Sequence, residues 1–345
     1  MDPNKFLVCV RCFTYNHASY IVDAMSGFTM QQTDFPFVCT IVDDASTDGE
    51  QEVIRHYLEE HFDLSDTATV RNEETDDYLL TFAQHKSNKN CYFAVLYLKY
   101  NHYSIKKPKK PYCAEWNEQA KYIALCEGDD YWIHPQKLQM QVRYLSANPN
   151  ALMCTHAFNT VTDSKRLLNT VNIIEKSGML DAGLIIENIH CPQTATFLFN
   201  HSLDQSMPTF FKQIGVGDYP MRVFAAINGG VLYINEVMSN YRKYSSGSWT
   251  SVMVNDTKRY LSYVDRMVAF VKELDVFTKG LYHENIENRI DYCNWIVFIK
   301  KKKFCKAMQT RYYHSHNFKQ KMELLIQYGT PKLWYVISKL YNRGS

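Results

Sequence analysis

Two apolar segments of this chain end abruptly in clusters of carboxylates. The run Tyr122–Cys126 is followed by Glu127, Asp129 and Asp130, with one glycine among them. Buried strands do not end in close like charges without a reason, because such charges repel each other. Mg²⁺ and Mn²⁺ prefer oxygen ligands, and Mg²⁺ is usually held by one or two carboxylates plus substrate phosphates. The pattern therefore predicts a site for Mn²⁺ or Mg²⁺ that carries a phosphorylated ligand.

Phe37–Val42 is the second apolar segment of this kind, and it leads into Asp43 and Asp44. After Asp48, a helical pattern with an acidic first turn begins at Glu50. In open α/β sheets, ligands bind beyond the carboxyl ends of the strands, so two acidic strand ends in one sheet are expected to face one crevice. The alternative is that the three aspartates only cap the following helix.

The hydrophobic periodicity predicts a β-α-β-α-β order over the first part of the chain. The expected strands are Phe6–Phe13, Phe37–Val42 and Ala68–Arg71, and the expected helices are Ala18–Gln32 and Glu50–His61. This order implies an α/β protein with a largely parallel sheet that is covered by helices.

Further along, the elements are shorter and the pattern is less regular. We expect helices at Trp116–Ala120, Pro135–Ala147 and Met221–Ala226, and strands at Ala151–Val161, Thr194–Asn200 and Val231–Ile234. Residues 72–111 are interpreted as an excursion from the sheet that is partly an exposed loop, whose lysines at 106–110 either meet phosphate or are merely solvated. Residues 163–192 are interpreted as a variable connection, and the pattern after Ser248 is helical. We place a domain boundary between 1–245 and 246–345.

Three segments, Cys12–His17, Ile41–Gly49 and Glu127–Trp132, lie at the ends of expected strands or just after them. In order and spacing they are similar to the three signature segments of family 2 glycosyltransferases, which have the GT-A fold, so the chain resembles that family. The resemblance is clear over roughly the first 160 residues and weaker to about residue 250. One position departs from the common Asp-x-Asp form, because Glu127 occupies its first place. Asp129 is therefore the expected direct metal ligand.

The resemblance implies that the chain transfers a sugar from a nucleotide-sugar, mostly with inversion at the anomeric carbon. Asp129, with Asp130 or Glu127, would hold the metal that bridges the diphosphate, while a sugar contact or a helix cap is an equal alternative for Asp130. Asp43 and Asp44 would accept hydrogen bonds from the nucleoside, such as a uracil N–H and the ribose hydroxyls.

The remaining nucleotide contacts are expected from two loops. Thr14 and Tyr15 lie in the turn after the first strand, where Tyr15 would stack on the base or be a core aromatic. The loop Asn240–Trp249 resembles one that closes over the diphosphate in many relatives, and Arg242 would pair with phosphate there. Ser246 and Ser248 would assist it.

A general base and an acceptor platform complete the expected site. The resemblance places the catalytic base at Asp218, which would also serve as a helix cap; Asp204 is the second choice. Tyr131 and Trp132, directly after the acidic cluster, would form a stacking platform for the acceptor sugar, although a core role for Trp132 is an equal alternative.

The cysteines and the apolar runs indicate where the protein works. Of ten cysteines, Cys9, Cys39, Cys126 and Cys154 lie inside strand-like apolar runs, as reduced thiols do in a cytosolic protein. Cys9 and Cys12 form a Cys-x-x-Cys without a second pair, so zinc or redox chemistry is not expected. The sequence has neither a secretory leader pattern nor an apolar run of 18 residues. We therefore expect a cytoplasmic protein.

The charge of the chain is unevenly distributed. Residues 300–345 carry eleven Lys and Arg and one Glu, a charge of +10, so the remainder sums to −8 against a total of +2. Lysines mixed with aromatic residues and leucine in this segment suit an interfacial helix at the inner face of a membrane, which would fit a lipid-linked acceptor. The alternative is a packed C-terminal helix with a solvated basic face. Nothing else supports nucleic-acid binding.

Three functions remain open from the sequence. The leading one is a metal-dependent inverting glycosyltransferase that uses a UDP-sugar and a glycan or lipid-linked glycan acceptor in surface polysaccharide biosynthesis. A nucleotidyltransferase would be expected to have a glycine-rich phosphate loop after its first strand, and the turn after Phe13 contains no glycine. A non-catalytic module that binds a nucleotide or a glycan is the third.

Overall fold

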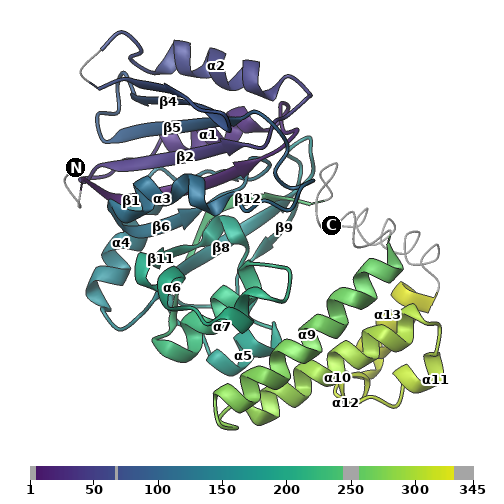
Figure 1. Cartoon of the computed structure of the whole chain (residues 1–345). Coiled ribbons are helices and arrows are strands. Elements are labelled where there is room, and N and C mark those ends of the chain that lie inside the picture. The colour runs from purple at the N-terminus through teal and green to yellow at the C-terminus, as the bar shows by residue number, and fades with distance from the viewer. Residues whose placement is uncertain (1–4, 67–68, 244–255, 330–345) are drawn as a thin grey trace. The chain divides into compact units, whose positions relative to one another are not determined.

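A computed structural model of the chain describes residues 5–66, 69–243 and 256–329. Its strands are β1 (Phe6–Thr14), β2 (Phe37–Asp43), β3 (Arg71–Glu74), β4 (Tyr78–Gln84), β5 (Cys91–Leu98), β6 (Ala120–Leu125), β7 (Tyr131–Trp132), β8 (Met153–Val161), β9 (Leu167–Val171), β10 (Gly178–Met179), β11 (Leu198–Asn200) and β12 (Val231–Arg242). Within the described residues these twelve strands form one mixed sheet in the order β10-β12-β8-β11-β6-β1-β2-β5-β4-β3, with β7 beside β12 and β9 beside β8 (Figure 1). The central strands β5, β2, β1 and β6 run parallel.

Helices follow or separate these strands. The α-helices are α1 (Ile21–Thr29), α2 (Glu50–His61), α3 (Ala114–Glu118), α4 (Lys137–Ala147), α5 (Ala182–Glu187), α6 (His201–Ser206), α7 (Asp218–Asn228), α9 (Thr257–Phe277), α10 (His283–Lys300), α11 (Phe304–Ala307), α12 (Arg311–His314) and α13 (Phe318–Gly329). Short 3₁₀ helices are η1 (Lys110–Cys113), η2 (Thr194–Thr196) and η3 (Thr209–Lys212). No helix of the described residues is both long and apolar enough to cross a membrane.

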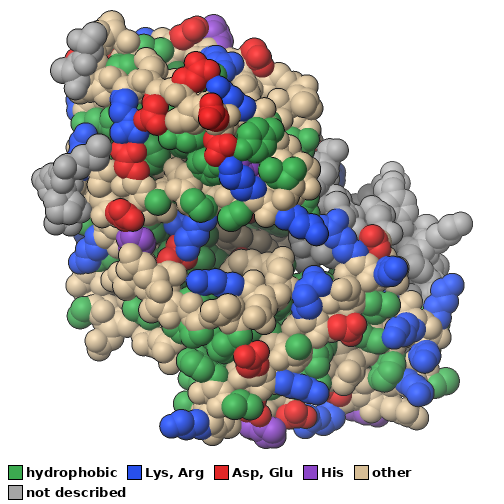
Figure 2. Space-filling view, viewed as in Figure 1, with side chains coloured by type: hydrophobic (Ala, Val, Ile, Leu, Met, Phe, Trp, Pro, Cys, Tyr) green, Lys and Arg blue, Asp and Glu red, His purple; other side chains and the backbone are tan. Residues whose placement is uncertain are grey.

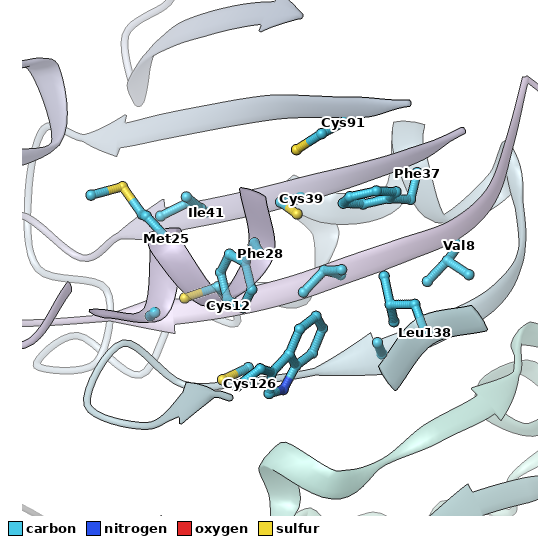
Figure 3. Close-up of a cluster of buried hydrophobic side chains, with 14 of the residues drawn as sticks. Val8, Cys12, Met25, Phe28, Phe37, Cys39, Ile41, Cys91, Cys126 and Leu138 are labelled. Carbon is cyan, nitrogen blue, oxygen red and sulfur yellow. The ribbon is translucent and has the colours of Figure 1, made fainter. Parts of the chain in front are cut away.

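The main core lies between the parallel strands and the helices α1, α2 and α4. Alternate residues of the strands point into it, as the period of two along a strand requires. Figure 3 shows Met25 and Phe28 of α1 over Ile41 and Cys12 of the sheet, all fully buried. Phe28 also meets the ring of Trp132 edge to face at a centroid distance of 4.9 Å. Burial of this apolar face fixes the register in which the strands end together.

The opposite face of the sheet carries an ion-pair cluster around the buried carboxylate of Asp204. Arg11 of β1 donates to the carboxylate of Asp204 at 2.9 Å, and Lys110 lies 3.0 Å from the same carboxylate. Burial alone would raise the pKa of Asp204, but the two cations more than offset this and lower it. A carboxylate held ionised by two cations is a weak base, so these contacts do not favour Asp204 as the general base.

The described chain divides into two compact units. The first comprises residues 1–182, 190–207 and 221–248 and contains the sheet; the second comprises 183–189, 208–220 and 249–345 and contains α9 to α13. Each unit is therefore made from more than one stretch of the sequence. In the second unit α9 and α10 pack against each other.

The largest departure from the sequence prediction concerns residues 72–111, which were expected to leave the sheet. Nearly half of them form β3, β4 and β5, and β5 pairs in parallel with β2 from Phe37↔Cys91 to Asp43↔Tyr97. The run Cys91–Leu98 is almost entirely buried, as expected for a strand inside a parallel sheet. The acidic and basic residues that flank this run concealed its strand character.

Several element boundaries also differ. The first helix covers only Ile21–Thr29, the strand expected at Thr194–Asn200 begins only at Leu198 after a 3₁₀ turn, and the third strand begins at Arg71. The connection 163–192 contains β9, β10 and α5 rather than being irregular. Terminal turns and two-residue strands carry too little periodicity to be located from sequence.

A lysine is buried in the core beside the ring of Trp132. Lys137 is 0% exposed; its Nζ donates to Gln141 Oε1 at 2.7 Å and lies 4.1 Å from the ring centroid of Trp132. Burial lowers the pKa of Lys137 from 10.5 to about 7. Its charge is therefore disfavoured in the folded protein relative to the unfolded chain.

We expect Lys137→Met to stabilise the protein more at pH 6 than at pH 9. The folded-state pKa lies below the unfolded value, so the penalty for burying the lysine grows as pH falls from 10.5 toward 7 and is constant below that. The difference between the two pH values is on the order of 2 kcal/mol in the free energy of unfolding. Loss of the hydrogen bond to Gln141 is a pH-independent cost. Denaturant unfolding of both proteins at both pH values measures this, with the exposed Lys121→Met as the control; a gain independent of pH would contradict it.

Candidate active site at the carboxyl edge of the sheet

The turns after β1 and β6 are packed directly against each other. The backbone N–H of Gly128 donates to the carbonyl of Phe13 at 3.2 Å. A Cβ added at Gly128 would lie 2.1 Å from Thr14 Oγ1 and 2.7 Å from Thr14 Cβ. Since Thr14 is also paired with Asp43 in the β1–β2 register, three acidic or polar strand ends lie at one edge of the sheet. The glycine within the acidic cluster is what permits this approach.

Glu50, the first residue of α2, fixes the turn after β1. Its buried carboxylate accepts hydrogen bonds from the Thr14 hydroxyl, from the backbone N–H of His17 at 2.8 Å and from the Ser46 hydroxyl at 2.8 Å. Burial raises the pKa of Glu50, although these donors partly offset the effect. The sequence analysis did not identify this residue, because an acidic first turn is an ordinary helix feature.

Asp43 has one carboxylate oxygen that no other described residue contacts by a hydrogen bond. Its Oδ2 accepts from Gln51 Nε2 at 2.5 Å and from the Ser46 N–H at 3.2 Å. Its Oδ1 is buried and has no hydrogen-bond partner among the residues that the structure describes. Burial raises the pKa of this carboxyl group. A ligand N–H or O–H would satisfy Oδ1, which agrees with the nucleoside contact expected from the sequence.

Asp44, by contrast, is fully engaged with the loop that follows β5. Its carboxylate accepts from the backbone N–H groups of His102 at 2.6 Å and Tyr103 at 3.2 Å, and it pairs with Lys109 Nζ at 2.8 Å. Asp44 therefore anchors this loop at the edge of the sheet. A contact between Asp44 and a nucleoside would have to replace one of these bonds.

Three of the four lysines in the basic segment 106–110, whose contact with phosphate was an open alternative, are paired with carboxylates. Lys107 Nζ lies 2.7 Å from Asp77, and Lys109 and Lys110 pair with Asp44 and Asp204. Hydrogen bonds from Lys107 and two tyrosines hold the pKa of Asp77 well below its usual range. These pairs tie the segment to three separate parts of the first unit.

Asp48, in the turn after β2, and Tyr15, in the turn after β1, have different environments. Asp48 acts as a cap: its Oδ1 accepts from the Glu50 N–H at 3.1 Å and its Oδ2 from the Ala18 N–H at 2.9 Å. Tyr15 is 42% exposed, so it is a surface aromatic and its ring is accessible for stacking on a base.

Asp130 and Arg242 join the acidic cluster to the end of β12. Strand β7 pairs with β12 through Tyr131↔Asn240. This brings the Arg242 N–H to within 2.9 Å of Asp130 Oδ1. Burial and, to a smaller extent, the charge of Asp129 raise the pKa of Asp130 well above its usual value. The contact with the Arg242 backbone favours a positioning role for Asp130.

The guanidinium of Arg242 is enclosed by protein groups. It donates to the Asp129 carbonyl at 2.6 Å, pairs with Asp23, and lies 4.8 Å from the Tyr20 ring centroid and 4.6 Å from that of Tyr131. Arg242 is 1% exposed, so a phosphate contact would require it to leave Asp23. Its Nε has no partner among the described residues.

The two aromatic residues expected to bind the acceptor lie in different environments. Trp132 is 1% exposed, and its Nε1 donates to the Ala195 carbonyl at 2.9 Å. Of the two interpretations of Trp132, the structure supports the core role and not the acceptor platform. Tyr131 is only partly buried and remains available at the edge.

The fit of a divalent cation can be judged from the donors present. Glu127 is exposed and Asp129 partly exposed. Among the described residues no three His, Cys, Asp or Glu side chains gather as a metal-binding group. A cation held by one or two carboxylates and by the phosphates of its ligand does not need such a group. Glu127 and Asp129 fit that kind of site.

Three further residues were expected to contribute to the site. Asp218 is the first residue of α7, and by its contacts it belongs to the second unit. Ser246 and Ser248 lie outside the described residues.

The parallel core, the acidic strand ends and the flanking helices together define the GT-A fold of glycosyltransferases. No family model matches the chain. Among curated proteins, the uncharacterized protein Rv1520 of Mycobacterium tuberculosis and the uncharacterized protein Mb1547 of Mycobacterium bovis are each 26% identical to it over 246 residues, 71% of this chain and 61% of the relative. The chain therefore spans less than two thirds of the length of these relatives.

Solved structures show the same fold. The structure of S. aureus TarS 1–349 in complex with UDP-GlcNAc has a TM-score of 0.55 at 14% identity, covering 95% of this chain and 83% of that one. The structure of S. aureus TarS has a TM-score of 0.53 at 15% identity, covering 85% of this chain and 43% of that one. At such identities the likeness establishes the fold, which agrees with the fold expected from the sequence.

Proposed function

We propose that the chain is a metal-dependent, inverting glycosyltransferase that moves a sugar from a UDP-sugar to a glycan or lipid-linked glycan acceptor in surface polysaccharide biosynthesis. The observation that carries this proposal is the junction of the Thr14 and Gly128 turns, which brings Asp129 beside the end of β1. The fold supports it, and so does the presence of UDP-GlcNAc in one TarS structure. The sugar, the acceptor and the linkage depend on side chains around this edge.

The donor would lie across the carboxyl edge of the sheet. Asp43 Oδ1 would accept a nucleoside N–H or O–H, Tyr15 would stack on the base, and Thr14 would shape the turn beneath it. Asp44 would contribute by holding the loop after β5. Glu127 and Asp129 would hold Mn²⁺ or Mg²⁺, which when bound offsets the charge that develops on the leaving diphosphate.

The transfer would proceed as a single displacement. Asp218 would accept the proton of the acceptor hydroxyl while that oxygen bonds to the anomeric carbon and the bond to the diphosphate breaks. Arg242 would contact the diphosphate after release from Asp23, and Tyr131 would contact the acceptor. Asp130 would keep the end of β12 in place through the Arg242 backbone.

A lipid-linked acceptor would bring the protein to a membrane surface. The protein would then be a cytoplasmic enzyme that contacts the inner face of the membrane. Exposed lysines at 301–303 and at 306 support this contact. Figure 2 shows Lys and Arg side chains, with fewer Asp and Glu, over the region of the helices α9 to α12 in this view. A basic surface of this kind is attracted to anionic lipid.

A panel of UDP-, GDP- and dTDP-sugars with Mn²⁺ or Mg²⁺ tests the proposal by release of the nucleoside diphosphate. We expect slow, metal-dependent hydrolysis of one UDP-sugar that is lost on chelation, because water replaces the absent acceptor. Calorimetric titration with UDP and Mn²⁺ is the companion measurement. Binding of UDP without release from any donor, with glycan acceptors present, would indicate a binding module. Absence of UDP binding would overturn the proposal.

A further inference from the structure

The second unit contains a cavity of about 520 Å³ between the end of α5, helix α10 and the region of α12. Its lining includes Asn288, Arg289 and Tyr292 of α10, together with Arg311 and Ser315. The volume lies within the range of about 300–1,000 Å³ that is typical of small-molecule sites. All its lining residues belong to the second unit, so the cavity shares none of the strand-end residues of the first unit described above.

Arg289 is a buried cation that has no anionic partner within residues 5–66, 69–243 and 256–329. It is 6% exposed, and its Nε has no hydrogen-bond partner among the described residues. Its Nη1 reaches only the carbonyl of Glu187 at 3.5 Å, the upper limit for a hydrogen bond. No carboxylate oxygen of the described residues lies within 4.0 Å of its nitrogens. A planar donor group of this kind is suited to bidentate binding of phosphate or carboxylate.

Aromatic rings compensate for the charge of Arg289 only in part. Its guanidinium carbon lies 5.3 Å from the Tyr219 ring centroid and 5.2 Å from that of Tyr292. Cation–π contacts stabilise the charge but leave the N–H donors unsatisfied, and buried charges are normally paired. An anion in the cavity would supply the missing acceptors.

The two carboxylates of the cavity are committed to other donors. Glu187 Oε1 accepts from Asn285 Nδ2 at 2.6 Å and from Asn288 Nδ2 at 3.2 Å. Asp291 Oδ2 accepts from the backbone N–H of Tyr312 at 2.5 Å. These acids therefore hold the walls of the cavity together and do not neutralise Arg289.

The remaining lining suits a sugar ring. Tyr292, Tyr312 and the 62% exposed Ile189 offer flat or apolar surfaces, and Asn288 and Ser315 offer polar groups. A saccharide needs both kinds, because its C–H face packs on rings while its hydroxyls need hydrogen-bond partners. Arg311 also lines the cavity. Its side chain is 65% exposed, and its Nη2 lies 3.9 Å from Glu287 Oε2, which is a long contact for an ion pair.

We propose that this cavity binds a sugar residue that carries an anionic group, phosphate or carboxylate, with Arg289 as the anion-binding residue. The choice of a sugar rests on the proposed glycosyltransferase function; the choice of an anion rests on Arg289 alone. An anionic glycan would thus be held by a set of residues that does not include Asp43, Glu127, Asp129 or Asp218.

Calorimetric titration of the full chain without donor or metal tests this inference independently of turnover. The ligands are glucose 1-phosphate, glucuronate, glucose and inorganic phosphate. We expect one of the two anionic sugars to bind at least about tenfold more tightly than glucose or phosphate. If glucose binds as tightly as the anionic sugars, Arg289 is not the anion-binding residue. If inorganic phosphate binds as tightly, the ligand need not be a sugar. If neither anionic sugar binds, the proposal fails in both respects.

Variants locate the binding site. Ser315→Trp places a large ring at the cavity from an exposed position without removing a buried group, and it should abolish binding. Ser262→Trp, exposed on α9 and outside the cavity lining, is its matched control and should bind normally. Arg289→Gln should lose the preference for anionic sugars and Arg289→Lys should retain part of it. Unchanged binding in Ser315→Trp would overturn the site, whatever the donor assay shows.

Discussion

Asp129→Asn is expected to reduce metal-dependent release of nucleoside diphosphate by about 10²–10³-fold, the effect of removing one preorganised group that stabilises transition-state charge. The change keeps the size of the side chain and leaves untouched the Asp129 carbonyl that holds Arg242. Binding of UDP in Mn²⁺ should weaken, whereas metal-free binding should be unaffected. Steady-state release assays and calorimetry measure the two effects.

Comparison of Asp218→Asn with Asp129→Asn distinguishes a loss of proton transfer from a loss of metal binding. It should lower turnover while UDP and Mn²⁺ bind as in the wild type, because a general base acts only on the acceptor. Asp34→Asn, at an exposed aspartate, is the control and should leave both unchanged. Full activity in Asp129→Asn would contradict the assignment of the acidic cluster as the metal site.

Gly128→Ala is expected to remove most activity, even though it adds only one methyl group. The added Cβ would lie 2.7 Å from Thr14 Cβ, and rotation of the Thr14 hydroxyl cannot relieve that contact. The two turns must therefore separate, which would move Asp129 away from the end of β1. Overpacking of this kind typically costs about 1–3 kcal/mol of stability.

Gly178→Ala is the matched control for this substitution. Gly178 lies in a strand of the same unit, and a Cβ added there meets no atom within 4 Å. Thermal unfolding and the donor assay should show a loss in Gly128→Ala only. Wild-type activity in a folded Gly128→Ala protein would show that the close approach of the turns is not required.

The outline of the fold could be predicted because strong periodic signals mark it. Apolar strands that end in Asp43 and in Glu127 indicated both the parallel order and the common edge, and the structure has that order. The strand at Cys91–Leu98 was missed because charged segments flank a run that is buried on both faces. The charged residues at both ends of this run led to the prediction of a loop, although the run itself is apolar enough for a strand.

The site was harder to predict because much of it depends on contacts between distant residues. Asp43 and Asp44 are neighbours of the same chemical type. Yet Asp43 Oδ1 has no hydrogen-bond partner in the described part of the chain, whereas Asp44 accepts from the backbone N–H of His102. Likewise, no local pattern reveals that Glu50 fixes the turn at Thr14 or that Asp23 holds Arg242. Residue type indicated which chemistry was present, and three-dimensional packing determined which atoms remain available for it.

The discontinuous make-up of the two units limits how the protein can be divided for study. Segments 183–189 and 208–220 belong to the helical unit, although the stretches on either side of them complete the sheet unit. Within the helical unit, Glu187 accepts from Asn285 and Arg289 contacts Tyr219. A fragment truncated near residue 245 would keep these two segments and lose the helices on which they pack. The two units therefore cannot be separated by cutting the chain at a single position, and each is best studied within the full chain.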